Sequence, residues 1–507
     1  MERNIYAHIE RLVHYGTINF GLCPGDAMYA RNRIYAALKL DGAVAQEADT
    51  QDIAAMDTPD DLLEPLLGYA QSQGIITESE RSLFDTELMG LLLPAPSQVH
   101  ARFTGLMKSS GSRAALDDFY RTGIRSNYIR MRDVRKNLIW TAKADKADLV
   151  VTINLSKPEK DNKEIARLKS LPQKSYPRCM LCFENMGYSG RADFPARHTL
   201  RFLPIELAGE QWFLQFSPYV YYDQHCIAFS MEHKPMTLDR STFTKLTDFL
   251  DLFPHYFIGS NACLPIVGGS ILTHEHFQGG GYEMPMHKCG SRRAFSGGFH
   301  GVSAEILDWY NSVITLRSED AQKLADAAGA VLETWQNYSD ESAGILAFSG
   351  GQPHNAVTPI ARKENGSYRL DLILRNNRTD EMYPDGIFHA HPSRHNIKKE
   401  GIGIIEVMGL FILPGRLQRE CAAIAQILTG ELKSLPEGME AHSKAAGILA
   451  KEHGTSLSAE QAEKAVKEYI NQTCISILED TAVFKNHADG QSAFERFMRA
   501  CGYTPAD

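Results

Sequence analysis

The feature that decides the fold is the stretch Gly268-Gly269-Ser270-Ile271-Leu272-Thr273-His274-Glu275-His276-Phe277-Gln278-Gly279-Gly280. Because residues i, i+2 and i+4 share one face of a β-strand, His274, His276 and Gln278 are expected to point one way, and Glu275 and Phe277 the other. The flanking glycines allow backbone to approach a ligand closely. Such a strand can present an imidazole nucleophile, a metal ligand and an amide donor to one phosphate, so nucleotidyl transfer is the first hypothesis.

The histidine pair alone is a weak signal. With 18 histidines in 507 residues, roughly 0.6 His-x-His pairs are expected by chance, and His389-Ala390-His391 is a second pair. Either pair can be two ordinary strand histidines. The first pair is distinguished by its glycines, by Ser270, by Gln278 in phase with it, and by a possible metal site elsewhere in the chain.

Size and composition indicate a soluble globular protein with several structural units. A chain of 507 residues is too long for one ordinary core. A formal charge of −9 argues against nucleic acid as the main partner. No apolar run approaches ~18 residues and no secretory signal opens the sequence, so no membrane span is expected. Nine cysteines, an odd number, suggest reduced thiols in the cytoplasm.

The period of the apolar residues changes along the chain. Four regions are expected: a helical N-terminal region (1–138), an α+β unit that ends in the histidine strand (139–290), a second α+β unit (291–416) and a helical C-terminal region (417–507). The first α+β unit is predicted to contain a helix over Thr237 to Phe257, and the second a strand over Ile402 to Leu413. A basic segment at 121–136 is interpreted as a solvated helix face rather than a ligand-facing patch.

Cys179-Met180-Leu181-Cys182 is the second feature with chemical meaning. Two cysteines at this spacing can bind one Zn²⁺ through both thiolates, while two further nitrogen or sulfur ligands complete a tetrahedron. The candidates for those ligands are His225, His233, His255 and His274. A redox motif would need a thioredoxin-like βαβ context, which the neighbouring sequence does not supply. Zinc is therefore favoured over structural thiols, and redox chemistry is the least favoured.

The order of these motifs resembles one protein family. Cys-x-x-Cys-x-x-Asn, with Asn185 as its last residue, is followed by the segment from His225 to His233, then by Asn261, by Gly268-x-Ser270 and by His274-x-His276-x-Gln278. This order is similar to that of the galactose-1-phosphate uridylyltransferases of the histidine-triad superfamily, and in detail to their second bacterial class. Residues 152–160, 217–222 and 253–261 carry the closer match. The resemblance covers about 150–290 strongly and about 385–415 again.

The resemblance implies both a fold and an activity. The fold is α+β, with two histidine-triad-like antiparallel-sheet units with packed helices, plus helical N- and C-terminal regions. The activity is transfer of UMP from UDP-glucose to galactose-1-phosphate through a covalent uridylyl-histidine, which gives UDP-galactose and glucose-1-phosphate. The implied partners are UDP-hexose and hexose-1-phosphate substrates and a second copy of the chain in a homodimer. No organic cofactor, nucleic acid or membrane is expected.

The same resemblance implies roles for individual residues. His276 would be the nucleophile, and Gln278 would donate an N–H to a phosphate oxygen. A glutamine cannot act as an acid at neutral pH, which favours transfer over hydrolysis. The residues that would bind substrate are Asn261, Gly268, Gly269, Ser270, Lys157 and Lys160. The residues that match the zinc-ligand positions are Cys179, Cys182, His233 and His274.

The sequence departs at several positions from the better-known class of galactose-1-phosphate uridylyltransferases, and these departures leave some assignments open. Three residues separate Ser270 from His274, one more than expected, and Glu275 stands where a proline is common. The resemblance would place a ligand of a second metal after the His274-x-His276-x-Gln278 motif, but no carboxylate stands at that position. A second metal at His389 and His391 is therefore disfavoured. Contacts to the sugar or simple packing are the alternatives for those two. Two competing functions remain: a dinucleoside-polyphosphate phosphorylase, and a non-catalytic, zinc-stabilised nucleotide-binding protein.

Overall fold

The computed structural model describes residues 5–42, 48–156, 175–269 and 271–506, and the chain divides into two units. The first unit comprises 1–136, 160–206 and 211–233, and the second comprises 137–159, 207–210 and 234–507. The predicted α+β class with antiparallel sheets is confirmed, since both units combine helices with antiparallel strand pairs. Lys157, Lys160 and Ser270 lie outside the described residues.

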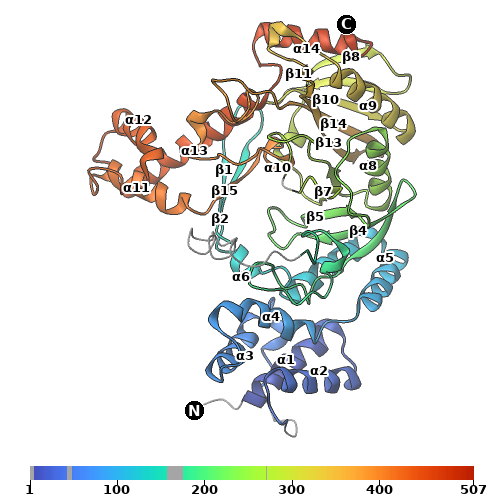
Figure 1. Ribbon diagram of the computed structural model, residues 1–507, viewed down its shortest axis with the longest axis vertical. Coiled ribbons are helices and arrows are strands. Elements are labelled where there is room, and N and C mark those ends of the chain that lie inside the picture. The colour runs from blue at the N-terminus through green and yellow to red at the C-terminus, as the bar shows by residue number, and fades with distance from the viewer. Residues whose placement is uncertain (1–4, 43–47, 157–174, 270, 507) are drawn as a thin grey trace. The chain divides into compact units, whose positions relative to one another are not determined.

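Helices dominate the N-terminal part of the first unit (Figure 1). They are α1 (Ile5–Phe20), α2 (Pro24–Ala37), α3 (Asp60–Ser72), α4 (Arg81–Gly90), α5 (Pro96–Arg125) and α6 (Met131–Val134). The apolar faces of α1 to α4 form one core, with Ile9, Leu12, Leu66 and Leu88 fully buried. The 3.6-residue periodicity of the sequence predicts these buried faces.

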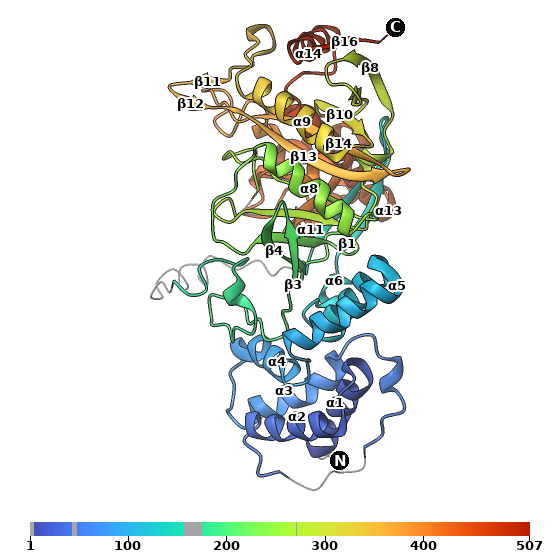
Figure 2. The same cartoon turned by 90° about the vertical axis from the view of Figure 1, so that its right-hand side faces the viewer.

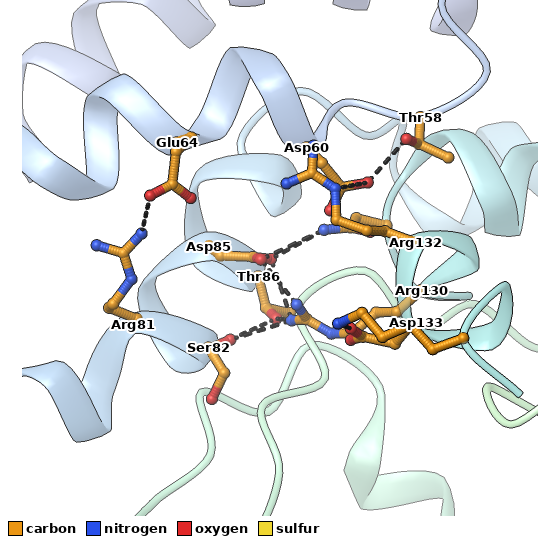
Figure 3. A network of polar contacts seen from close by, with 12 residues as sticks. Thr58, Asp60, Glu64, Arg81, Ser82, Asp85, Thr86, Arg130, Arg132 and Asp133 are labelled. Carbon is orange, nitrogen blue, oxygen red and sulfur yellow. Dashed lines mark hydrogen bonds and ion pairs between the residues drawn. The ribbon is translucent and has the colours of Figure 1, made fainter. Parts of the chain in front are cut away.

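The basic segment 121–136 pairs with carboxylates of the same unit. The guanidinium of Arg130 donates to Asp85 at 2.8 Å, and Arg132 pairs with Asp60 (Figure 3). Arg132 also pairs with Asp61. Asp85 is 6 % exposed and also accepts from the Asn127 amide at 3.3 Å. Arg130 pairs with a buried carboxylate and so differs from the solvated helix face that was predicted, whereas Arg135 and Lys136 are exposed as predicted.

The first unit also contains three strands. They are β3 (Leu203–Leu207), β4 (Glu210–Phe216) and β5 (Cys226–Ser230), in the order β5-β4-β3. Strands β4 and β5 pair antiparallel, with Leu214 opposite Ala228. Both residues are fully buried. The segment that carries Cys179 and Cys182 precedes these strands and ends in a 3₁₀ turn, Phe183–Asn185.

An antiparallel run of eight strands forms the centre of the second unit. Its order is β16 (Tyr503–Pro505), β8 (Ser291–Gly297), β9 (Ser303–Leu307), β10 (Val313–Ser318), β14 (Ser367–Asn376), β13 (Asn355–Glu364), β6 (Phe257–Gly259) and β7 (His276–Gly280). Two helices, α8 (Arg240–Leu252) and α9 (Ala321–Gln336), lie side by side on one face of it (Figure 2). The helix predicted over Thr237 to Phe257 is thus shorter, because the Asp239 carboxylate caps its first turn.

A separate three-stranded sheet joins distant parts of the second unit. It consists of β1 (Leu138–Ala142), β2 (Leu149–Asn154) and β15 (Leu410–Pro414), and β15 runs parallel to β2. The single strand predicted over Ile402 to Leu413 is wrong, because the short helix α10 (Ile404–Val407) precedes β15. Glu406 accepts from the Gly403 N–H and stabilises the start of α10, and Gly409, with φ +92°, reverses the chain after it.

The C-terminal part of the second unit is helical, as the sequence predicts. Its helices are α11 (Leu417–Thr429), α12 (Ser443–His453), α13 (Ala459–Thr481) and α14 (Ala488–Ala500), and α11 packs on both α12 and α13. None of the nine cysteines, all of which lie in the described residues, forms a disulfide. In the described part of the chain no helix has the length and apolarity that a membrane span requires.

Candidate active site and metal centre

Strand β7 presents its alternate residues to opposite faces of the second unit's sheet. It pairs antiparallel with β6, with Gln278 opposite Gly259. On the helical face, the Glu275 carboxylate lies 3.1 Å from the Lys245 ammonium of α8. His276 and Gln278 are therefore on the face away from α8, as the alternation of the sequence predicts.

His276 is held in a defined protonation state. Its Nδ1 lies 2.8 Å from the carbonyl oxygen of His274. Burial lowers the pKa of His276 to about 4, although the hydrogen bond to the carbonyl opposes this. The imidazole is thus neutral at pH 7, and because a carbonyl only accepts, Nδ1 carries the proton. The remaining nitrogen, Nε2, has a free electron pair, which is the state that a nucleophile requires.

The glycines before His274 close around Asn261. A Cβ on Gly269 would lie 2.4 Å from the Asn261 Nδ2, and one on Gly268 would lie 2.4 Å from the carbonyl oxygen of Ala262, so neither position accepts a side chain. Asn261 is 3 % exposed, and its Oδ1 accepts from the Ile404 N–H at 3.0 Å. In the described residues these glycines lie against the chain's own Asn261, and the expected contact of their backbone with a ligand stays a prediction.

The first unit contains a compact group of potential metal ligands. The Sγ atoms of Cys179 and Cys182 are 3.4 Å apart, and the His233 Nδ1 lies 3.0 Å from the Cys182 Sγ. The amide of Asn185 donates to the carbonyl oxygens of both cysteines at 2.8 Å and so fixes the turn. This explains the asparagine of the motif, for which the sequence gives no role.

The chemistry of this group fits zinc. Zn–S bonds of about 2.3 Å and Zn–N bonds of about 2.0 Å place the ligand atoms of one ion within about 4 Å of each other, and the observed distances meet that limit. Burial, and then the hydrogen bond with Cys179, raise the pKa of the Cys182 thiol to about 12. A cation would reverse that shift, because the thiolate is the form that binds metal.

His274, the fourth ligand that the resemblance implies, belongs to the second unit and is fully buried. The other histidines considered from sequence have different surroundings. His225 and His255 are not among the potential metal ligands found in the described residues, and neither are His389 and His391. His389 accepts from the Ile402 N–H at 3.3 Å. His391 lies 3.2 Å from Asp480. These are contacts of packed histidines, and the two sequence-based alternatives for the pair, sugar contacts and packing, stay predictions.

Comparison with known proteins decides the family. A model described as galactose-1-phosphate uridyl transferase, N-terminal domain, matches residues 24–235, and its C-terminal counterpart matches residues 249–446. The chain belongs to the galactose-1-phosphate uridylyltransferase family. The resemblance seen in the order of the motifs is thereby confirmed.

Full-length relatives carry the name of this uridylyltransferase family. A galactose-1-phosphate uridylyltransferase of Caldanaerobacter subterraneus subsp. tengcongensis is 44% identical over 510 residues, 98% of each chain. One of Bacillus subtilis is 43% identical over 509 residues, 99% of each chain. Among solved structures, yeast Ap4A phosphorylase Apa2 is 12% identical with a TM-score of 0.29, over 57% of this chain and 81% of that one, which is too distant to bear on function.

Sequence reasoning missed two features of this uridylyltransferase-family site. The first is Lys245, which explains why a glutamate rather than a proline stands between the two histidines. The second is the backbone from Ile402 to Ile404, which lies against Asn261. Neither has a local signal, because each partner is separated from the motif by 30 or more residues.

Proposed function

We propose that the chain is a nucleotidyltransferase that transfers UMP from UDP-glucose to galactose-1-phosphate and releases UDP-galactose and glucose-1-phosphate. The observation that carries the proposal is the contact of 2.8 Å between the His276 Nδ1 and the His274 carbonyl oxygen, which leaves Nε2 as the nitrogen for nucleophilic attack. The relatives named galactose-1-phosphate uridylyltransferase, which match the chain over nearly its whole length, support this choice of substrates.

In the first half-reaction, the His276 Nε2 attacks the α-phosphorus of UDP-glucose. A nitrogen–phosphorus bond forms, the bond from the α-phosphorus to the bridging oxygen breaks, and glucose-1-phosphate leaves with that oxygen. The uridylylated imidazole is cationic, and the hydrogen bond from Nδ1 to the His274 carbonyl stabilises that charge. A phosphate oxygen of galactose-1-phosphate then attacks the same phosphorus and restores the neutral histidine.

The remaining site residues bind and orient the phosphates. Gln278 lies on the same face as His276, two residues further along β7, and would donate an amide N–H to a phosphoryl oxygen. Asn261 and the backbone at Gly268 and Gly269 would supply further donors, as would Ser270, Lys157 and Lys160. Phosphoryl transfer gains most of its rate from positioning and neutralisation of charge, which such donors provide.

Zinc is proposed as a structural metal bound by Cys179, Cys182, His233 and His274. Supporting His274 as the fourth ligand, the Glu275 N–H donates to the Lys234 carbonyl at 2.8 Å, so the residues that follow His274 and His233 are hydrogen-bonded to each other. A bound Zn²⁺ would hold both thiolates and cross-link the chain. Its proposed effect on the reaction is indirect, through the backbone of His274, whose carbonyl fixes His276.

The test is exchange of labelled glucose-1-phosphate into UDP-glucose without any galactose compound. The covalent mechanism predicts exchange, because the first half-reaction is reversible. Folded protein that binds UDP-glucose but shows no exchange would instead be a nucleotide-binding protein. A parallel incubation with a dinucleoside tetraphosphate and inorganic phosphate tests the phosphorylase alternative, and turnover there without exchange would replace the proposal.

A further inference from the structure

Arg375 is a buried cation with little to bind. It lies on β14 and is 1 % exposed, yet its one hydrogen bond in the described part of the chain runs from Nη2 to the carbonyl oxygen of Ile402, at 2.9 Å. Its Nε and Nη1 are buried and have no partner among the described residues. Burial lowers its pKa to about 10, so the group is still charged at neutral pH.

The strand register places Arg375 on the same face of the sheet as the nucleophile. Asp371 on β14 is opposite Ile360 on β13, Ile360 is opposite Gly259 on β6, and Gly259 is opposite Gln278 on β7. Residues directly opposite each other in antiparallel strands share a face. Arg375, four residues after Asp371, therefore points to the side that carries Gln278 and His276.

A short backbone segment connects Arg375 to Asn261. Both backbone polar groups of Ile402 are hydrogen-bonded. Its carbonyl accepts from Arg375, and its N–H donates to the His389 Nε2 at 3.3 Å. Two residues later, the Ile404 N–H donates to the Asn261 Oδ1 at 3.0 Å. A side chain on Gly403, between them, would come within 3.2 Å of the same Oδ1. The orientation of the Asn261 amide thus depends on where this segment is held.

We propose that Arg375 is a positioning residue of the transfer site, which acts through the backbone of Ile402 to Ile404 to orient the Asn261 amide toward the phosphates. This inference rests on the proposed uridylyl transfer. The Nδ2 of Asn261 faces Gly269, in the loop that leads to His276. A rotation of the Asn261 amide would therefore change the donors available to the phosphate. His389 helps to hold the same segment, because its Nε2 accepts a hydrogen bond from the Ile402 N–H.

The energetics distinguish this role from a structural one. A buried charge with few hydrogen bonds does not stabilise a fold, and its replacement by an apolar side chain of similar volume is often neutral or stabilising. A buried cation whose burial is not offset by hydrogen bonds is expected to serve a functional geometry. Arg369, on the same strand and face, is the contrasting case: it is 3 % exposed, but pairs with Asp371 at 3.0 Å and with Glu364 at 3.4 Å.

The test compares Arg375→Met with Arg369→Met in the full chain. Arg375→Met is expected to keep the wild-type Tm or raise it, while kcat for exchange of glucose-1-phosphate into UDP-glucose falls at least tenfold. Arg369→Met is expected to lower Tm, because it removes the buried ion pair with Asp371, with kcat of the folded protein unchanged. If Arg375→Met does not fold, Arg375→Lys, which keeps the charge and one donor, is measured instead and should show an intermediate kcat.

A double variant tests whether the effect passes through Asn261. If it does, Arg375→Met combined with Asn261→Ala should be no slower than Asn261→Ala alone. Multiplicative losses, or exchange by Arg375→Met within twofold of the wild type, would overturn the positioning role. A wild-type protein without exchange would instead overturn the proposed function, and this inference with it.

Discussion

Glu275 and Lys245 form a buried ion pair directly behind the nucleophile: 3.1 Å separate the carboxylate from the ammonium, and the two residues are 1 % and 3 % exposed. Glu275 is the residue between His274 and His276, so this pair fixes the helical side of the same strand. Lys234 also lies 3.2 Å from Glu275. The position of His276 is therefore stabilised both by the ion pairs of Glu275 on the opposite face and by the pairing of β7 with β6.

Lys245→Met should destabilise the protein, because it leaves a buried carboxylate with one partially exposed cation. Loss of one partner of a buried pair typically costs about 3–5 kcal/mol, and we expect about 3 kcal/mol here because Lys234 remains. Urea denaturation measures the difference. The double variant Lys245→Met, Glu275→Leu should recover most of the loss; a double variant as unstable as the single one would contradict this account.

His276→Ala should abolish exchange of labelled glucose-1-phosphate while it leaves the fold and UDP-glucose binding nearly unchanged. The imidazole provides the atom that receives the uridylyl group, and no other group replaces it. Initial rates and calorimetric binding provide the two readouts. His300→Ala, at an exposed position, is the matched control and should retain full activity. Near-normal exchange by His276→Ala would show that another residue is the nucleophile.

Cys179→Ser should lower both the zinc content and the thermal stability, since a structural zinc site contributes directly to the folding free energy. Metal analysis of purified protein and its melting temperature measure the two effects. Cys421→Ser, at a partly buried thiol outside the cluster, controls for loss of a cysteine. Equal zinc content in the two variants would favour structural thiols at Cys179 and Cys182.

Gly269→Ala should reduce kcat for exchange about tenfold or more, because the added methyl group would lie 2.4 Å from the Asn261 Nδ2 and displace the amide. Gly290→Ala is the matched control, since a Cβ there meets no atom within 4 Å. Steady-state rates of both variants test the expectation. Equal rates would mean that the loop accommodates the methyl group without moving Asn261.

Asp371 should contribute to acid stability. Burial by itself would raise its pKa, but the Arg369 and Arg362 guanidinium groups outweigh burial and hold the pKa below its ordinary value of 3.8. The folded state therefore binds this proton less readily than the unfolded state, so the stabilisation is complete above that value and is lost as the pH falls through the lower, folded pKa. Unfolding free energies measured from pH 6 downward should lose this slope in Asp371→Asn. The control is Asp57→Asn, at an exposed carboxylate that pairs with Arg135, and it should keep the slope.

The chemistry of the site was accessible from sequence where it has a local period. Two patterns reflect constraints within a few residues: the alternation of His274, His276 and Gln278, and the spacing of Cys179 and Cys182. Both can therefore be recognised in the sequence before the fold is known. The partner of Glu275 on α8, and the contact of Ile404 with Asn261, depend on tertiary packing across distant segments. No pattern within either segment encodes them.

The strand predicted over Ile402 to Leu413 also shows that local sequence preference does not determine structure where tertiary contacts intervene. Its β-branched and apolar residues favour a strand, and the second half does form β15. The first half forms α10 instead, because the Ile404 N–H is used by Asn261 and the Gly403 N–H by Glu406. One tertiary hydrogen bond, from Ile404 to Asn261, and one local bond, from Gly403 to Glu406, thus outweigh the strand preference of the segment.

The parallel pairing of β15 with β2 has a consequence for biosynthesis. Val150 is paired with Leu410, about 260 residues later in the chain. At a synthesis rate of about 5–20 residues per second, the β1–β2 hairpin waits roughly 13 to 50 s for its third strand to leave the ribosome. During that interval Val151 and Ile153, buried in the finished sheet, lack their native cover. We expect this hairpin to be the segment of the nascent chain that most needs chaperone protection.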